Sequence, residues 1–77
     1  LLMSEEAAAR HGYTPLAVIR SAAMAALDPL EELLLGPAIT IPKALGAAGH
    51  ELEDVETVEL HEAFAAQVLA VLQLLED

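Results

Sequence analysis

The sequence predicts a small α/β unit, with a mostly α-helical chain as the alternative if these residues stand alone. Three observations lead to this fold class. Helix signals mark residues 4–12, residues 40–49 and the segment from Ala63 onward. Short apolar runs that suit strands lie at residues 1–3 and 57–60, and residues 14–29 suit either a helix or a strand. Proline and glycine separate several of these runs, as they do at turns and at the ends of elements.

The first predicted helix has both a start signal and a stop signal. Ser4 is a candidate N-cap, because its side-chain oxygen can accept a hydrogen bond from an N–H of the first turn. Glu5 and Glu6 suit the positive end of the helix dipole, and Gly12 suits the end of the helix. We expect the preceding residues 1–3 to be the end of a strand.

Residues 14–29, "TPLAVIRSAAMAALDP", are ambiguous from the residues alone. Thr14 and Pro15 make a good helix start, and the alanines favour a helix. The apolar run that contains Val18 and Ile19 favours a strand. Local propensity leans towards a helix, and the strand stays open as the alternative.

The next stretch, residues 28–42, reads as a loop bounded by prolines and a glycine. It contains three consecutive leucines, Leu33 to Leu35, which either fill a gap in a core or line a ligand pocket. A helix is then predicted to begin at Thr40 and Pro42 and to end at Gly49. A turn rich in acidic residues follows, and after it the short predicted strand at residues 57–60.

The last segment predicts a helix with little polar surface. One helical stripe contains Phe64, Val68, Val71, Leu72 and Leu75, and alanines and further leucines cover most of the other side. A helix that is apolar all round is normally buried on all sides. Because 77 residues cannot surround it, we expect either an oligomer or a piece of a larger protein.

Charge and composition exclude several classes of protein. Thirteen acidic residues oppose three basic ones, for a formal charge of −10, whereas phosphate binding needs clustered Lys and Arg. The chain is 56% hydrophobic, which argues against disorder, and it has no cysteine for a disulfide. No apolar run reaches the length of a membrane span, and no signal peptide is visible. We expect a cytoplasmic protein without nucleic-acid partners.

The dipeptide His61-Glu62 begins like the zinc motif H-E-x-x-H, in which two histidines one turn apart bind the same ion. The second histidine is replaced by Ala65, and His11 and His50 have no ligand at a useful spacing. We therefore expect no metal site.

The stretch "GPAITIPKALGAAGHELEDVETVELHEAFAAQ" resembles the segment of thiolases written roughly G-P-x-x-A-x-x-K-A-L-x-x-A-G-x-x-x-x-D-[IVL]-[DE]-x-[IVF]-E-x-[NH]-E-A-F-A-x-Q. The upstream part is also similar, so the resemblance covers essentially the whole chain. It implies that residues 1–13 end the first half of a thiolase and that residues 14–77 open the second half. The predicted fold is then part of a mixed sheet layered by helices, in which residues 15–27 form a strand.

Two details resemble one branch of the thiolases. Most thiolases have asparagine where this chain has His61, and others have a Met-Gly-x-Gly loop over the positions of Leu33 to Gly36. A histidine together with "LLLGP" resembles the β-subunits of fatty-acid oxidation multienzyme complexes. The implied partners are the remainder of the thiolase chain and either a second subunit of a homodimer or a multienzyme complex.

The resemblance also implies a reaction. A thiolase cleaves a 3-ketoacyl-CoA with CoA, or runs the reverse condensation, and it needs no cofactor beyond these CoA thioesters. A nucleophilic cysteine accepts the acyl group, a histidine activates it and a second cysteine moves a proton. In the family these three groups lie outside the matched segment, so we expect the parent protein to be the enzyme and these 77 residues to be inactive alone.

The implied site residues are four. His61 would donate a hydrogen bond to the oxyanion, Phe64 would line the pantetheine channel, and Leu33 and Leu34 would border the acyl pocket. Glu62 is interpreted as structural, holding the loop through backbone N–H groups at the helix start.

Other hypotheses stay open beside this one. The chain could be a small non-catalytic helical protein whose apolar last helix is an oligomer interface. It could also be a thiolase-fold relative without thiolase chemistry. A lone histidine such as His61 is, outside this family, more often a cap or a packed core residue.

Overall fold

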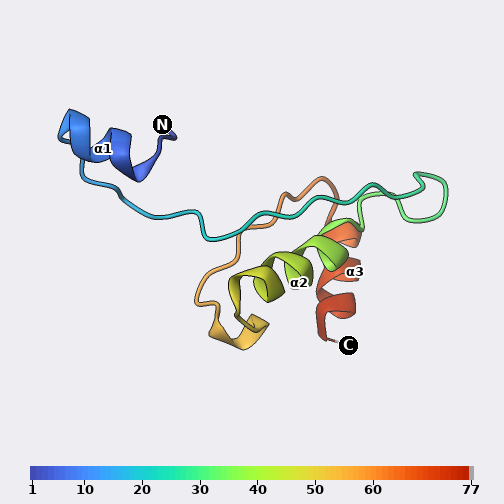
Figure 1. Cartoon of the computed structure of the whole chain (residues 1–77). Helices are drawn as coiled ribbons and strands as arrows, with labels where there is room; N and C mark the ends of the chain where they lie inside the picture. The colour runs from blue at the N-terminus through green and yellow to red at the C-terminus, as the bar shows by residue number, and fades with distance from the viewer. Residues whose placement is uncertain (77) are drawn as a thin grey trace.

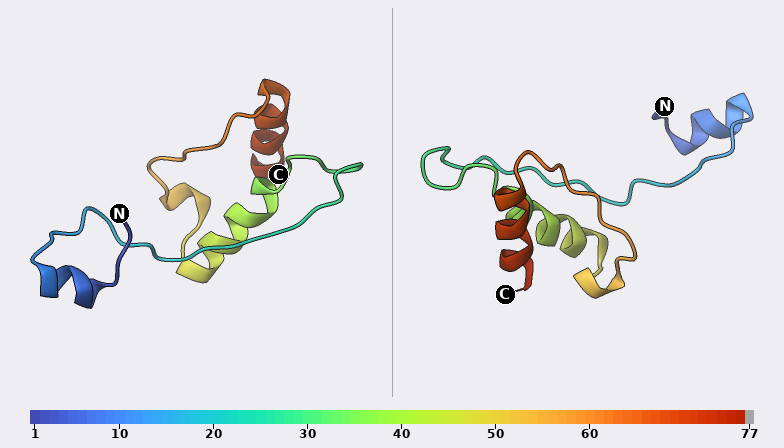
Figure 2. Two further views of the ribbon diagram at one scale, coloured as in Figure 1. Left: turned by 90° about the horizontal axis from the view of Figure 1, so that it is seen from above. Right: turned by 180° about the vertical axis from the view of Figure 1, so that it is seen from behind.

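The computed structural model describes residues 1–76, and every regular element in that range is helical. The elements are α1 (Glu5–His11), α2 (Pro37–Ala48), the short 3₁₀ helix η1 (Leu52–Asp54) and α3 (Ala65–Glu76). Figure 1 shows α1 at one end, joined by a long extended segment to the part that contains α2 and α3. The views of Figure 2 confirm that α1 stands apart from the other helices.

The overall shape is elongated. The radius of gyration is 15.6 Å and the principal extents are 47 × 25 × 20 Å. A compact domain of this length would have a radius of gyration of about 11 Å. The described residues therefore form an open arrangement.

Helix α1 begins and ends as the sequence predicts. The Ser4 side chain accepts a hydrogen bond from the backbone N–H of Ala7 at 3.1 Å. At the other end Gly12 is left-handed with φ 71°, and the N–H of Tyr13 donates to the carbonyl of Ala8 at 2.8 Å. This pattern closes the last turn and satisfies carbonyls that would otherwise lack a partner.

Helix α2 begins three residues earlier than expected, and its predicted end is confirmed. Pro37 occupies the first helical position, where its fixed φ fits and its missing N–H is not needed. Pro42 lies inside the helix instead of at its start, and there it removes only the hydrogen bond to the Ala38 carbonyl. Gly49 ends the helix at φ 77°.

The three predicted strands are not formed among residues 1–76, and for residues 15–27 this corrects both alternatives. That segment is neither strand nor helix but extended chain (Figure 1), and residues 1–3 and 57–60 have no regular structure. A strand needs the hydrogen bonds of a neighbouring strand, and no second strand lies within the described residues to supply them. The extended segment runs along α2, where the Ser21 hydroxyl donates to the Ala44 carbonyl at 2.6 Å (Figure 1).

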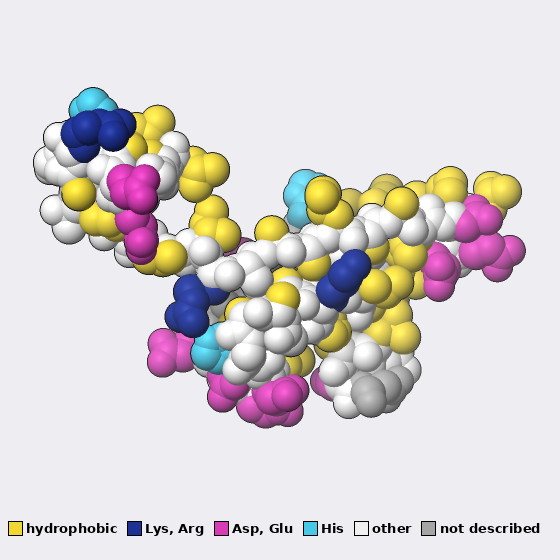
Figure 3. All heavy atoms as spheres, in the orientation of Figure 1, with side chains coloured by type: hydrophobic (Ala, Val, Ile, Leu, Met, Phe, Trp, Pro, Cys, Tyr) yellow, Lys and Arg dark blue, Asp and Glu magenta, His cyan; other side chains and the backbone are white. Residues whose placement is uncertain are grey.

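Very little of the chain is buried. Helices α2 and α3 contact each other, and in α3 Val71 is fully buried; Ala8 of α1, at 4% exposure, is the other buried residue described. Large apolar side chains such as Leu16, Ile19 and Met24 are exposed. Figure 3 shows hydrophobic side chains open on the face in view, many of them along the extended segment.

Much of the apolar surface of α3 is uncovered within residues 1–76. Leu69, Leu72 and Leu74 are all exposed, and the expected oligomer or larger protein stays a prediction. No helix in residues 1–76 is long and apolar enough to cross a membrane.

Two glycines, one within α2 and one directly after it, test where this helix ends. Both have open space around an added Cβ, but Gly49 has φ +77° and Gly46 lies within the helix. Gly46→Ala should raise the helix content of the chain, because alanine is favoured over glycine in a helix by about 1 kcal/mol. Gly49→Ala should lower it, because an L side chain is strained at positive φ. Circular dichroism at 222 nm measures both, and changes of the same sign would contradict the assignment of the helix end.

Candidate functional site

The segment "HEAF", residues 61–64, leads directly into α3. Phe64 is the residue before the helix, and the Val68 N–H donates to its carbonyl at 3.2 Å. The side-chain oxygen of Gln67 reaches back to the Phe64 N–H at 3.5 Å, which is a long contact. A glutamine at the third helical position makes this contact in a capping box. This long contact lies where the motif enters the helix.

His61 and Phe64 are both exposed, with Phe64 66% accessible. His61 lies in irregular chain and makes no hydrogen bond with another described residue. The expectation for Glu62 is not met in this structure, because Gln67 and not Glu62 bonds to an N–H at the helix start. The alternative that His61 is a packed core residue is not realised either, since its side chain is exposed.

Leu33 and Leu34 lie at the centre of a tight turn before α2. The Leu35 N–H donates to the Glu32 carbonyl at 3.1 Å, which closes a β-turn over these four residues. Leu34 has φ 66°, the one non-glycine residue with positive φ among those described. A positive φ at the third residue of a turn is typical of a type II turn, which normally takes glycine or asparagine there.

The left-handed backbone of Leu34 is strained. An L residue other than glycine, asparagine or aspartate is disfavoured in this region by about 1–2 kcal/mol. Composition and periodicity gave no sign of this. The available signal was the thiolase pattern Met-Gly-x-Gly, which puts a glycine at the position of Leu34. The turn keeps the conformation of a glycine turn while carrying a leucine.

The structure does not bring the four predicted site residues into one enclosed pocket. One hollow, of about 790 Å³, is lined by residues 1–5, Ala8 and residues 13–19, and a second lies between α2, η1 and the end of α3. Neither is lined by Leu33, Leu34, His61 or Phe64. The motif and the leucine turn thus lie outside both of these hollows.

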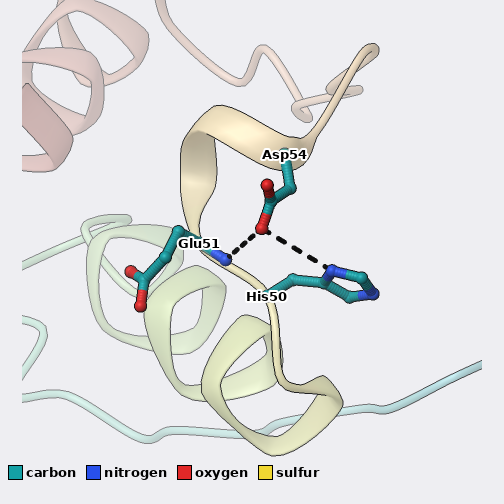
Figure 4. A network of polar contacts seen from close by, with 3 residues as sticks. All are labelled: His50, Glu51 and Asp54. Carbon is teal, nitrogen blue, oxygen red and sulfur yellow. Dashed lines mark hydrogen bonds and ion pairs between the residues drawn. The ribbon is translucent and has the colours of Figure 1, made fainter.

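A further histidine lies in a small polar network that follows α2 (Figure 4). One carboxylate oxygen of Asp54 accepts a hydrogen bond from the Glu51 N–H at 2.9 Å and lies 3.7 Å from Nδ1 of His50. The side chains of His50 and Asp54 are about half exposed. Asp54 bonds back to the residue before η1, so the network holds this turn. No group of three or more possible metal ligands occurs in residues 1–76.

Comparison with known proteins decides the family. The family model for the C-terminal domain of thiolase matches residues 13–77. The chain belongs to the thiolase family. This confirms the resemblance on which the site residues were chosen, and it places the HEAF motif and the leucine turn inside the thiolase C-terminal domain match.

Individual thiolases are similar along nearly the whole chain. It is 53% identical over 74 residues to proteins named 3-ketoacyl-CoA thiolase from Shewanella piezotolerans and Shewanella pealeana, which covers 96% of the chain. It is 50% identical over 77 residues, its full length, to a probable 3-ketoacyl-CoA thiolase from Caenorhabditis elegans. The chain spans 17% of the length of each of these relatives. No solved structure gives a significant match.

Proposed function

We propose that these residues are part of a 3-ketoacyl-CoA thiolase, to which they contribute a donor for the oxyanion hole. The observation that carries the proposal is the motif from His61 to Phe64, directly before α3, in a chain that belongs to the thiolase family. The names of the similar proteins support the substrate class, a 3-ketoacyl thioester of CoA.

The chemistry assigned to His61 is electrostatic. When a 3-ketoacyl-CoA is cleaved, negative charge develops on a carbonyl oxygen as the acetyl-CoA enolate departs. An N–H of a neutral imidazole aimed at that oxygen stabilises the charge as it forms, as an asparagine amide does. Nucleophile and bases come from elsewhere in the protein, since this chain has no cysteine.

The same proposal implies what surrounds these residues in the full protein. The remainder of the thiolase chain covers the exposed apolar side chains and supplies strands that pair with residues 15–27. The histidine variant of the motif, together with "LLLGP", supports a β-subunit of a fatty-acid oxidation complex, which we place in the cytoplasm. A homodimer is the alternative assembly.

A second candidate function rests on α3 alone. Its exposed leucines would also suit a small helical protein that forms oligomers. The identity to thiolases over 96–100% of the chain supports the enzymatic origin instead.

His61 can be tested in the full-length protein. His61→Ala should lower kcat for thiolysis of a 3-ketoacyl-CoA by about a hundredfold or more, because one oxyanion donor is lost. His61→Asn should restore most of the rate, because an asparagine amide also donates. Steady-state kinetics and a thermal melt measure activity and folding on the same samples.

The matched control is His50→Ala, which removes an exposed histidine outside the motif. It should leave kcat within about twofold of the unmodified enzyme, as is usual for a surface change away from the site. Near-normal turnover of a folded His61→Ala enzyme would contradict the assigned role.

Phe64 should act on binding more than on chemistry. In the full-length enzyme Phe64→Ala should raise KM for the CoA thioester about tenfold, because it removes an aromatic wall of the pantetheine channel. The value of kcat should change less than KM. A fall in kcat with an unchanged KM would contradict the assignment, and Phe64→Leu, which keeps an apolar side chain, should show the smaller effect.

A further inference from the structure

Gln67 is the third residue of α3, and its side chain reaches back to the residue before the helix. The side-chain oxygen lies 3.5 Å from the Phe64 nitrogen, a long contact. The Phe64 carbonyl accepts from the Val68 N–H at 3.2 Å, as the carbonyl of an N-cap residue does. Phe64 thus occupies the N-cap position, where a side-chain oxygen normally accepts from the first turn. A phenylalanine has no such oxygen.

The same arrangement occurs a second time in the chain, at η1. There the Glu51 N–H donates to a carboxylate oxygen of Asp54, three residues later, at 2.9 Å, and the Glu51 side chain accepts a bond in return. At α3 only the returning half of such a capping box can form, because Phe64 has no acceptor. Within residues 1–76, Gln67 is the one side chain that accepts from an N–H at this helix start.

The backbone at this helix start determines where the motif lies. The Phe64 N–H belongs to the planar peptide that joins Ala63 to Phe64, so an acceptor for this N–H orients that peptide. His61 lies two residues further back, in irregular chain, and its exposed side chain bonds to no other residue among 1–76. The direction of its imidazole therefore depends on the backbone that connects it to α3. A misplacement of about 1 Å in a reacting geometry can cost about a hundredfold in rate.

We propose that Gln67 is a positioning residue of the full-length enzyme, which orients the peptide between Ala63 and Phe64 and through it directs His61 at the oxyanion. This inference rests on the oxyanion role proposed above for His61. Gln67 acts through the backbone and contacts neither the substrate nor the reacting atoms. Loss of its acceptor lowers the rate of the chemical step, whereas a role limited to helix stability would lower the melting temperature alone.

The test replaces Gln67 by methionine in the full-length enzyme, because methionine keeps the length and the helix preference but is only a weak acceptor. For thiolysis of 3-ketodecanoyl-CoA, kcat should fall about tenfold while KM changes less than about twofold. Gln67→Ala, which also removes the acceptor, should show the same loss. Gln67→Glu keeps an acceptor suited to a helix start and should restore kcat to within about threefold of the unmodified enzyme.

The matched control is Gln73→Met, which changes an exposed glutamine of the same helix, six residues further along. It should leave kcat within about twofold of the unmodified enzyme. A double-mutant cycle then separates positioning from general damage. In a His61→Ala enzyme there is no imidazole left to direct, so adding Gln67→Met should lower kcat by less than about twofold.

The outcomes separate this inference from the proposed function. Near-normal kcat in a folded Gln67→Met or Gln67→Ala enzyme overturns the inference. So does a tenfold loss that persists in the His61→Ala background, or one that Gln67→Glu does not restore, since Gln67 would then act on the fold and not on His61. Near-normal turnover of the His61→Ala enzyme alone, or no thiolysis by the unmodified enzyme, overturns the proposed function itself.

Discussion

Ordering a residue costs about 1–2 kcal/mol of backbone entropy, and buried apolar surface has to offset this in any folded chain. In residues 1–76 little apolar surface is buried, so it offsets little of this entropy cost. Val71 is fully buried and Ala8 nearly so, while leucines, isoleucines and a phenylalanine lie exposed along the whole length. The elongated shape and the lack of strand pairing within residues 1–76 both follow from this shortage.

The helix ends that depend on neighbouring residues could be predicted from the sequence. The hydroxyl of Ser4 and the positive φ of Gly12 and Gly49 act over three to five residues, so the ends of α1 and the end of α2 were predictable from the residues alone. The start of α2 was misplaced, because Pro37 and Pro42 are both good start signals and only the structure shows that the helix tolerates the second.

What depends on distant partners was not predictable from this segment. The thiolase resemblance implies a strand at residues 15–27, yet a strand requires neighbouring strands that residues 1–76 do not provide. The same holds for the site. The motif from His61 to Phe64 could be found by its resemblance to thiolases, but within residues 1–76 its side chains are exposed. Leucine itself carries no signal for the positive φ at position 34, and only the glycine of the thiolase pattern at that position indicated it.

The thiolase family membership and the open structure support one physical account. Short helices form within residues 1–76, where much apolar surface and extended backbone stays uncovered. Our proposal is that the rest of a thiolase covers these parts. A motif displayed at the start of α3 and a strained leucine turn before α2 would become parts of one site only in that larger fold.

The most direct measurement is differential scanning calorimetry of the 77-residue chain at several concentrations, beside the full-length protein. The account predicts no heat-absorption peak for the chain alone, because it buries too little apolar surface to unfold cooperatively, and a sharp peak for the full-length protein. A cooperative peak for the isolated chain at any concentration would contradict it, since these residues would then complete their own fold.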